Sequence, residues 1–405
     1  MLKKNIYFLL IIFICITNCI YRGGIKPTLN KISIIYISNW TIEQAAQIAT
    51  LIKEAKQLNP TIVIVNGDIF SRRPLTDLNK GLPEVELLNN CQIDALLLSP
   101  DFLKWGIQNT QELIKKSNFS CLAANIKDKT TNQTLAQEYL IQKVNNAQIS
   151  VLGVSYDSLN YYFADKNLQF DHAEFTVSKL LPILKMRSDL QFIVTQANDS
   201  LDFPVNYLFG APLKKYVQLI PYDRPGIYKL DISYNNSKEI QGLERVTLST
   251  SGLSDDSITQ VTLVQFQVKT DSILNLKINK NKQISDVNDL NDWAIKKLIE
   301  ETKTQSFLSN QPLIGKALML NDTSMIALYN VLNEKNILPI ATINGKELQK
   351  YSKKLFPLIA KISDNQNYPI LTTLDFLKSN PEIKFNSIEF SNLTVWEILR
   401  NNLNE

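Results

Sequence analysis

Along the first half of this chain, short continuous apolar runs alternate with segments whose apolar residues recur at helical spacing. The segments "KISIIYIS" (31–38) and "TIVIVNGD" (61–68) are short continuous runs of β-branched and aliphatic residues, which indicates buried strands. Between them, residues 41–58 carry apolar positions at helical spacing. Thr41, followed three residues later by Gln44, is a candidate N-cap for this helix. This succession predicts an α/β fold.

The alternation continues beyond residue 80. Helices are predicted at "PEVELLNNC", "NTQELIKKS" and "AEFTVSKLLPILKM", and strands at "DALLLSP", "FSCLAANI" and "LQFIVTQ". A hairpin that turns at Asn145-Asn146 is predicted within "EYLIQKVNNAQISVLGVSY". The later segments "KYVQLIPY", "GIYKLDISYN" and "SITQVTLVQFQVKT" are rich in β-forming residues. We therefore expect paired strands there, in an α/β domain with mixed sheets.

Length and pattern together predict two domains. A chain of 405 residues is long enough to bury two separate cores. Residues 31–268 form the predicted first domain, 269–290 a connector, and 291–405 a second α/β unit that begins with the helix "LNDWAIKKLIEETKTQ". The net charge is only +4, and basic and acidic residues are interspersed. Nucleic acid is therefore not expected as the main partner, because it favours a strongly basic face.

The amino terminus has the features of an export signal. "MLKK" supplies a basic start, and the apolar run "NIYFLLIIFICI" is shorter than the roughly 20 residues that span a bilayer. The run ends in "ITNC", which resembles the lipobox of bacterial lipoproteins, with Asn18 where a small residue is usual. Residues 1–18 are then a lipoprotein signal peptide, Cys19 the lipidated residue, and 19–30 a tether. An ordinary signal peptide with an incidental cysteine, or an uncleaved anchor, is the alternative.

This reading predicts an exported protein that is anchored in the lipid bilayer and faces the periplasm or the cell surface. Of the remaining cysteines, Cys91 and Cys121 flank strand-like runs, where they could pair in an oxidising compartment or stay as buried free thiols. No CxxC and no metal-type cysteine spacing is present.

The order of these segments resembles the secreted 5′-nucleotidase family. The resemblance lies in framework segments: "KGLPEVELLNNCQIDALLLSPDFLKWG", "SNFSCLAANI", "INGKELQKYSKKL", "YPILTTLDFLKSNPEIKF" and "LTVWEILRNNL". It implies a calcineurin-like metallophosphoesterase domain, a four-layer α/β/β/α sandwich, followed by a smaller α/β domain that binds the nucleoside. It also implies a metal-dependent phosphoric monoester hydrolase as the ancestral activity.

The metal motifs of that family are largely replaced in this chain. Its opening Asp-x-His appears as Asn39 and Thr41, and its Gly-Asn-His-Glu as a segment in which Asp101 is the one carboxylate. The later histidine positions hold Gln196, Ala211 and Leu213.

The Gly-Asp motif is intact as Gly67-Asp68, so Asp68 is the single ligand that survives in kind. The only histidine, His172, lies outside all five motifs, and a surface or helix-cap role is expected for it.

The nucleoside-binding loops have changed as well. Asn321 and Asp322 occupy the usual Gly-Gly-x-Arg loop, and Asn333–Asn336 the Pro-Phe-Gly-Asn turn, with the loss of one stacking ring. Asp375, Phe376 and Phe385 remain as remnants of the substrate loop, although an isolated Phe is more often a core residue than a platform for a base.

These losses predict a non-catalytic binding or structural protein with no required cofactor. The alternative is a phosphohydrolase with an atypical site, in which oxygens from Asp68, Asp101, Asn39 and Gln196 hold one Mg²⁺ or Ca²⁺. Asp68 would otherwise be a helix-capping or loop-bonding carboxylate. A third possibility is another small ligand in the cleft between the domains, or an unidentified protein partner.

Overall fold

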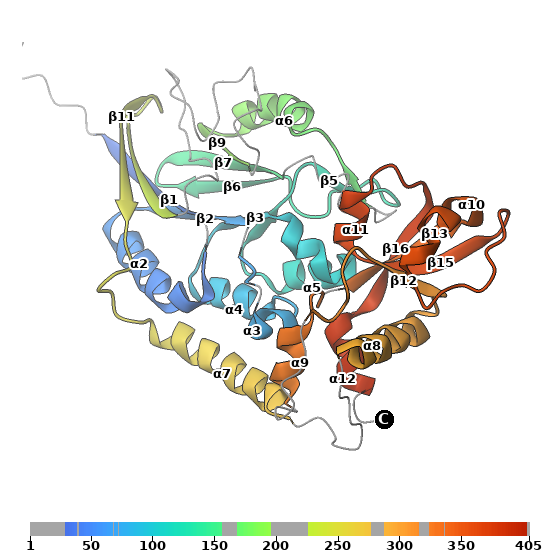
Figure 1. Cartoon of the computed structure of the whole chain (residues 1–405). Helices are drawn as coiled ribbons and strands as arrows, with labels where there is room; N and C mark the ends of the chain where they lie inside the picture. The colour runs from blue at the N-terminus through green and yellow to red at the C-terminus, as the bar shows by residue number, and fades with distance from the viewer. Residues whose placement is uncertain are drawn as a thin grey trace, which may run out of the picture.

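Two α/β units make up the described part of the chain (Figure 1). The structure is a computed structural model that describes residues 29–38, 40–67, 69–71, 73–155, 168–195, 226–276, 287–315, 324–335 and 337–402. None of the described helices combines the length and the apolarity that crossing a membrane requires.

The first unit is built on a six-stranded sheet in the order β11-β10-β1-β2-β3-β4. The parallel part contains β1 (Asn30–Ser38), β2 (Thr61–Gly67), β3 (Ala95–Leu98) and β4 (Ser120–Leu122). The hairpin of β10 (Gly226–Tyr234) and β11 (Ile240–Leu248) adds two antiparallel strands beside β1. The central strands are buried on both faces, as their continuous apolar runs predict.

A second sheet packs against the first. It contains β6 (Tyr139–Val144), β7 (Ala147–Val154) and β9 (Leu190–Thr195), with β7 parallel to β9. Two further strands, β5 (Ile126–Asp128) and β8 (Leu168–Phe170), form a separate antiparallel pair. The predicted hairpin is confirmed: β6 and β7 are joined at Asn145-Asn146, and Asn145 has φ of 55°, which a short hairpin turn requires.

Helices cover the outer face of each sheet. The first sheet is covered by α2 (Ala45–Leu58), α3 (Pro74–Leu78), α4 (Leu82–Asn90) and α5 (Ile107–Lys116), together with the short helices η1 (Ile42–Gln44) and η2 (Pro100–Trp105). Helix α6 (Ala173–Arg187) covers the second sheet.

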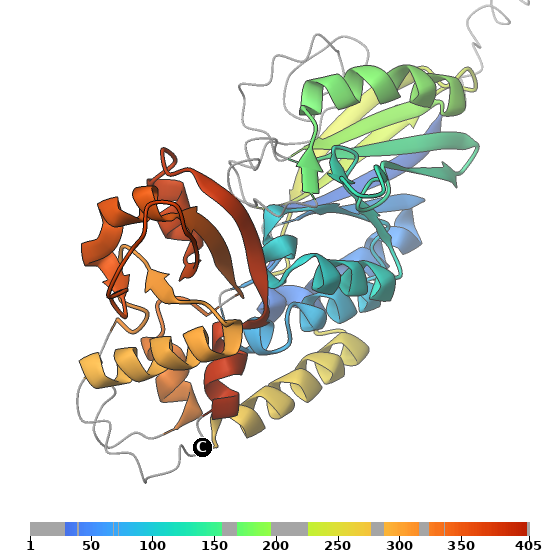
Figure 2. The same ribbon diagram turned by 90° about the vertical axis from the view of Figure 1, so that its right-hand side faces the viewer.

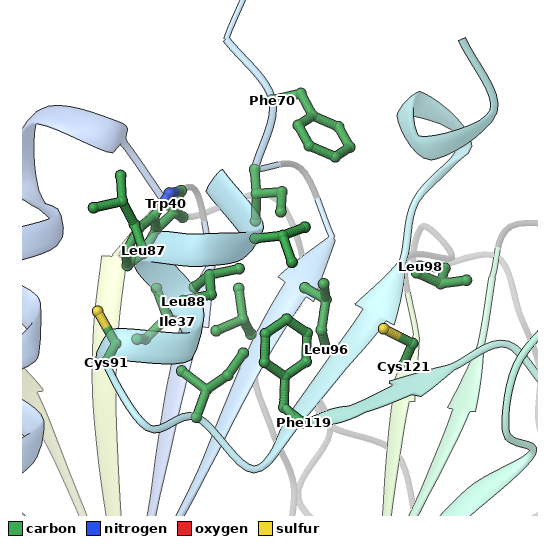
Figure 3. Packing of buried hydrophobic residues seen from close by; sticks show 14 of the residues in the cluster. Ile37, Trp40, Phe70, Leu87, Leu88, Cys91, Leu96, Leu98, Phe119 and Cys121 are labelled. Carbon is green, nitrogen blue, oxygen red and sulfur yellow. The ribbon is translucent and has the colours of Figure 1, made fainter. Parts of the chain in front are cut away.

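Three apolar layers hold this unit together. One lies between helices and first sheet and includes Ile37, Leu88 and Leu96 (Figure 3). Another lies between the two sheets, and the third lies between the second sheet and α6. The predicted four-layer α/β/β/α sandwich is therefore confirmed.

The second unit is smaller and has one five-stranded sheet. The strand order is β14 (Leu355–Phe356), β12 (Ser306–Leu308), β15 (Asn367–Thr372), β13 (Ile337–Asn344) and β16 (Phe385–Thr394). Helices α8 (Val287–Thr302), α9 (Met325–Val331) and α12 (Val395–Asn402) bury one apolar face. Helices α10 (Gly345–Leu348), η4 (Gln349–Lys354) and α11 (Leu374–Ser379) bury the other.

The segment expected to be β-rich, "SITQVTLVQFQVKT", is instead the long helix α7 (Ser257–Leu274). Its N-cap is Asp256, whose carboxylate accepts a hydrogen bond of 3.0 Å from the backbone nitrogen of Thr259. The buried positions Thr259, Leu263, Thr270 and Leu274 form one stripe along the helix. The helix lies against α2, α3 and α4, and Leu274 near its end packs in the apolar cluster of the second unit. Packing has overridden the β preference of its Val and Thr residues. The connector expected at 269–290 begins inside this helix, and the strand expected at 215–222 lies outside the described residues.

Thr41 does not cap a helix through its side chain, which corrects the prediction of Thr41 as the N-cap of the helix over 41–58. Its backbone is extended and precedes η1, and its side chain makes no capping hydrogen bond. Helix α2 begins only at Ala45, because the tight η1 turn fills the positions between them.

Candidate functional site

Parallel strands bring their carboxyl ends to one edge of the first sheet, where α/β proteins commonly bind ligands. Ser38 ends β1, Gly67 ends β2, and Ser99 follows β3 directly. Ser155 follows β7 of the second sheet and approaches the same edge, since its hydroxyl donates a hydrogen bond of 2.6 Å to the carbonyl of Leu98. The candidate site is therefore lined by small polar residues from both sheets.

Gly67 is fixed by close packing between β2 and β3. A Cβ atom at this position would lie 2.1 Å from the carbonyl oxygen of Leu97 and 2.5 Å from the nitrogen of Ser99. Backbone atoms cannot yield to such contacts without moving the strands apart. The glycine of the Gly67-Asp68 pair therefore has a structural reason to persist, whether or not a metal is bound beside it.

A hydrogen-bond network holds Ser155 in place. Its backbone nitrogen donates to Oδ1 of Asn125 over 2.8 Å, and Nδ2 of Asn125 donates to the carbonyl of Ser155 over 2.9 Å. The same Nδ2 lies 3.2 Å from the carbonyl of Asp171, which ties the start of α6 to this edge. The hydroxyl of Ser99 is buried and has no hydrogen-bond partner within the described part of the chain. The network is built from neutral hydroxyl and amide groups.

The motif positions that the structure describes are Thr41 and Asp101. Thr41 is half-buried between β1 and η1, and Asp101 is exposed in the first turn of η2. Five predicted positions lie outside the described residues: Asn39, Asp68, Gln196, Ala211 and Leu213. His172 is an exposed residue at the N-cap of α6, and its side chain makes no capping hydrogen bond there.

The described residues do not fit a two-metal centre. Such a centre holds its ions about 3.5–4 Å apart with several imidazole and carboxylate ligands. Among the residues that the structure describes, no group of three or more His, Cys, Asp or Glu side chains could hold an ion. Thr41 offers a hydroxyl, and Asp101 one exposed carboxylate. We therefore derive no catalytic step through a metal.

The remnants of the substrate loop in the second domain belong to different environments. Phe376 is completely buried, and its ring meets that of Tyr351 edge-to-face with centroids 6.1 Å apart. Phe385 is half-buried against the same apolar cluster, and Asp375 is exposed on α11. Phe376 is a core residue, so it cannot stack on a base without unfolding its surroundings.

A four-residue segment at the end of α3 joins the two units. The hydroxyl of Tyr329 donates to Oδ2 of Asp77, and Nζ of Lys80 lies 2.8 Å from Oε1 of Glu397. Leu78 packs against the apolar cluster of the second unit, and Asn79 donates to the hydroxyl of Thr270 in α7.

Sequence reasoning missed this junction. Nothing in the local sequence "LTDLNK" (75–80) indicates a contact between Asp77 and Tyr329, which are 252 positions apart. Such a pairing is a long-range signal that a single sequence does not carry.

Behind this junction lies a buried carboxyl group. Glu84 on α4 is completely buried, and its Oε1 accepts a hydrogen bond of 2.5 Å from the hydroxyl of Thr76. Its Oε2 has no hydrogen-bond partner among the described residues. Burial raises the pKa of Glu84 to about 7, against the smaller opposing effects of the Thr76 hydroxyl and the Lys104 ammonium.

Solved structures share this arrangement, although no family model and no curated protein matches the chain. A protein of Staphylococcus aureus assigned as a 5′-nucleotidase, in complex with α-ketoglutarate, is similar over 93% of this chain and 97% of its own, with 11% identity and a TM-score of 0.59. The chain has the two-domain fold of the 5′-nucleotidases.

Two further structures extend this likeness. A 5′-nucleotidase precursor of Thermus thermophilus gives a TM-score of 0.56 at 12% identity, covering 92% of this chain and 96% of that one. An NAD nucleotidase of Haemophilus influenzae gives 0.53 at 11% identity, with coverage of 92% and 96%. The predicted 5′-nucleotidase-like fold is thus confirmed. Identities this low show the fold of the chain and not its activity.

Proposed function

We propose that this chain is a membrane-anchored lipoprotein that keeps the 5′-nucleotidase fold without hydrolytic activity and acts as a binding or structural protein. Its lipid would be carried on Cys19, and its body would face the periplasm or the cell surface. One of the similar structures belongs to a 5′-nucleotidase precursor, which accords with export of proteins of this fold.

The observation that carries the proposal is the supply of metal ligands. Imidazole nitrogens favour zinc- and manganese-like ions, yet the whole chain contains one histidine. That residue is exposed at the N-cap of α6 and lies outside the five metal motifs. Thr41 and Asp101 supply few of the ligands that two ions need, and Ala211 and Leu213 have no donor atoms. A carboxylate at Asp68 alone cannot keep two dications from their hydration shells.

The framework is preserved for reasons that do not involve catalysis. Gly67 is required where β2 approaches β3, and Phe376 fills the core of the second domain. Segments that build the sandwich can therefore persist after the chemistry has been lost. The occupant of such a scaffold would be an unidentified protein or a small molecule in the region between the domains.

One observation favours a second candidate, an atypical hydrolase that uses oxygen ligands. Asp101 is an exposed carboxylate on η2, close in sequence to the end of β3. With Asp68, Asn39 and Gln196 it could offer oxygens to a single Mg²⁺ or Ca²⁺, which prefer such ligands.

The deciding experiment is an assay of phosphoester hydrolysis. The purified mature protein would be given a nucleoside monophosphate or a generic phosphomonoester, with Mn²⁺, Zn²⁺, Mg²⁺ or Ca²⁺ in turn. We expect no turnover above background and no stoichiometric metal in elemental analysis. The variant Asp68→Ala would be compared with Asp271→Ala, which removes an exposed carboxylate of α7 that belongs to none of the motifs.

Metal-dependent turnover that disappears in Asp68→Ala and survives in Asp271→Ala would overturn the proposal. It would establish the oxygen-ligand hydrolase instead. Metal binding without turnover would leave the protein non-catalytic, with an ion as part of its scaffold.

A further inference from the structure

The amino ends of the strands in the first domain form a surface that lies opposite the second domain (Figure 1, Figure 2). Here the start of β1 pairs with the end of β10, through Asn30 and Tyr234. The β6–β7 turn joins them, because Nδ2 of Asn145 donates to the carbonyl of Lys31 over 3.1 Å. The β10–β11 turn joins as well, through a hydrogen bond from Nζ of Lys238 to the carbonyl of Asn146.

The connections from helices to strands reach the same surface. Because β1, β2, β3 and β4 are parallel, the turns after α2, α4 and α5, which lead into β2, β3 and β4, lie at the same edge of the first sheet. The turn after α6 lies beside them, because Asp189 exchanges hydrogen bonds with the backbone of Gln148 at the start of β7. We call this surface, formed by the β1 start and these turns, the basic pole.

Basic side chains outnumber acidic ones on the basic pole. Two of the acidic groups are bonded within the protein: Asp94 accepts from Lys56 and from the backbone of Val63, and Asp189 accepts from the backbone of Gln148. The basic residues of the pole are Lys31, Lys56, Lys115, Lys116, Lys143, Lys185, Arg187 and Lys238, and its acidic residues are Glu54, Asp94, Asp189 and Glu239.

Exposed aliphatic side chains lie among these charges. Leu58, at the end of α2, is 79% exposed, and Met186, in the last turn of α6, is 80% exposed. Leu29, directly before β1, is 41% exposed. A surface that combines Lys and Arg with protruding aliphatic residues has the composition of a membrane-interface surface, since the charges attract anionic headgroups and the apolar groups enter the acyl boundary.

We propose that the basic pole docks on the surface of an anionic phospholipid bilayer. The chain reaches β1 through this same pole, so a lipid on Cys19 would emerge beside it. The ten residues from Ile20 to Leu29 span at most about 35 Å when fully extended. The inference rests on the proposed lipoprotein anchoring for this geometry. It adds a second contact, which would set the orientation of the protein and present the second domain away from the membrane.

A second contact makes physical sense for a lipid-anchored protein. A short tether keeps the local concentration of bilayer surface high, so weak attraction by several Lys and Arg residues is sufficient to orient the body. The attraction depends on charge and decreases as salt screens it.

The test uses the chain from Cys19 onward, produced without a lipid. All residues of the described apolar clusters lie between Ile32 and Leu399, so this chain keeps the whole core. Its binding would be measured by flotation with vesicles of phosphatidylcholine alone and of phosphatidylcholine with 30% phosphatidylglycerol. We expect binding to the anionic vesicles at low salt, weaker binding as salt rises, and little binding to neutral vesicles.

A charge-reversal variant and a matched control locate the contact. The triple variant Lys115→Glu, Lys116→Glu and Lys143→Glu should lower partitioning onto anionic vesicles by at least about tenfold. The control carries the same change of charge at exposed positions of the second domain: Lys353→Glu, Lys354→Glu and Lys361→Glu. It should keep partitioning within about twofold of the unmodified chain, because those positions lie far from the pole.

Absence of binding to anionic vesicles, or equal loss in the two triple variants, would overturn the inference. Because no lipid is present in this assay, its outcome does not depend on whether Cys19 is modified. A failure of lipidation and a failure of the basic pole are therefore distinguishable. In a third variant, Leu58→Ser with Met186→Ser, partitioning onto anionic vesicles should decrease at every salt concentration with an unchanged salt dependence, because no charge has been altered.

Discussion

The hydroxyl of Tyr329, in the second domain, donates a hydrogen bond of 2.5 Å to Oδ2 of Asp77, in the first. Burial raises the pKa of Tyr329, as does the negative charge of Asp77, so the phenol keeps the proton that it donates. Nζ of Lys104 lies 3.8 Å from the other carboxylate oxygen of Asp77. Nζ of Lys335 lies 4.9 Å from the centroid of the Tyr329 ring. This contact adds a buried hydrogen bond to the Lys80–Glu397 ion pair and the Leu78 packing that also join the two domains.

Replacing Tyr329 by Phe should destabilise the protein by about 1–3 kcal/mol, because the buried hydrogen bond from the phenol to Asp77 is lost. Urea unfolding of the mature chain, followed by circular dichroism, measures the change. The control is Tyr351→Phe, whose hydroxyl makes only a 3.5 Å contact with Glu382 at the surface and should change stability by less than about 0.5 kcal/mol. Equal effects of the two substitutions would contradict the role given to the Tyr329–Asp77 pair.

Stability should decrease between about pH 4.5 and pH 7 through Glu84. The folded state holds the proton of Glu84 up to about pH 7, whereas the unfolded state releases it near pH 4.5. The folded state therefore binds more protons in this window, so the contribution of Glu84 falls as pH rises and is constant above about pH 7. At about 1.4 kcal/mol per pKa unit, the loss is up to about 3 kcal/mol.

Glu84→Gln should remove this dependence, because the amide resembles the protonated acid and keeps an acceptor for Thr76. The difference in unfolding free energy between variant and parent should grow from pH 5 to pH 8. Glu112→Gln, at an exposed position of α5, is the control and should leave the pH profile unchanged. A difference that is the same at both pH values would show that Glu84 is ionised throughout.

Gly67→Ala should strongly destabilise the first domain. Its methyl group would meet backbone atoms of Leu97 and Ser99 at 2.1–2.5 Å, and β2 and β3 would have to separate. We expect a loss of about 2–4 kcal/mol, or failure to fold. Gly242→Ala is a suitable comparison, since a Cβ there would meet only the Ser233 side chain, at 3.7 Å, and it should cost less than about 1 kcal/mol. Thermal unfolding of both variants checks the prediction.

Cys91 and Cys121 should be unreactive free thiols. Cys91 and Cys121 are buried and unpaired on different sides of one apolar cluster (Figure 3). Burial raises the pKa of Cys121 to about 11 and raises that of Cys91 as well, so little thiolate forms near neutral pH. An aromatic disulfide reagent should label neither residue in the native protein and both in denaturant. A mass that fits an intramolecular disulfide would refute this.

Changing Cys19 to Ala should prevent lipid attachment and processing. The reason is the position of Cys19 at the end of the short apolar run, in "ITNC". Cell fractionation and intact-mass analysis should show a released or unprocessed protein, whereas Cys15→Ala, inside the predicted signal, should leave the mature mass unchanged. Unaltered membrane extraction and mass in Cys19→Ala would exclude the lipoprotein assignment.

Most of the sandwich was predictable because its strands are buried on both faces. Continuous apolar runs such as Thr61–Gly67 admit few other structures, and the Asn145-Asn146 turn fixes its hairpin locally. Helix α7 was not predictable in the same way, because its Val and Thr residues favour strands. The Asp256 cap and the buried positions Leu263 and Thr270 are present in the sequence, but the helix is selected only when they pack against α2, α3 and α4.

The candidate site was predictable only in part. The resemblance correctly indicated the fold and suggested which positions once held ligands. It could not show that Gly67 is fixed by contact with Leu97 and Ser99, or that Ser155 bridges the sheets through Leu98. These contacts depend on the register between neighbouring strands, which the order of residues alone does not give.

Helix α7 also has a consequence for synthesis of the chain. The ribosome completes α2, α3 and α4 long before residues 257–274 emerge, so the surface that α7 needs already exists when this segment appears. The nascent segment, rich in β-branched residues, thus has a folded partner at once. In a fragment that lacks residues 40–90, the same segment would lack the surface on which it packs as a helix. We expect it to pair as strands between molecules and to aggregate.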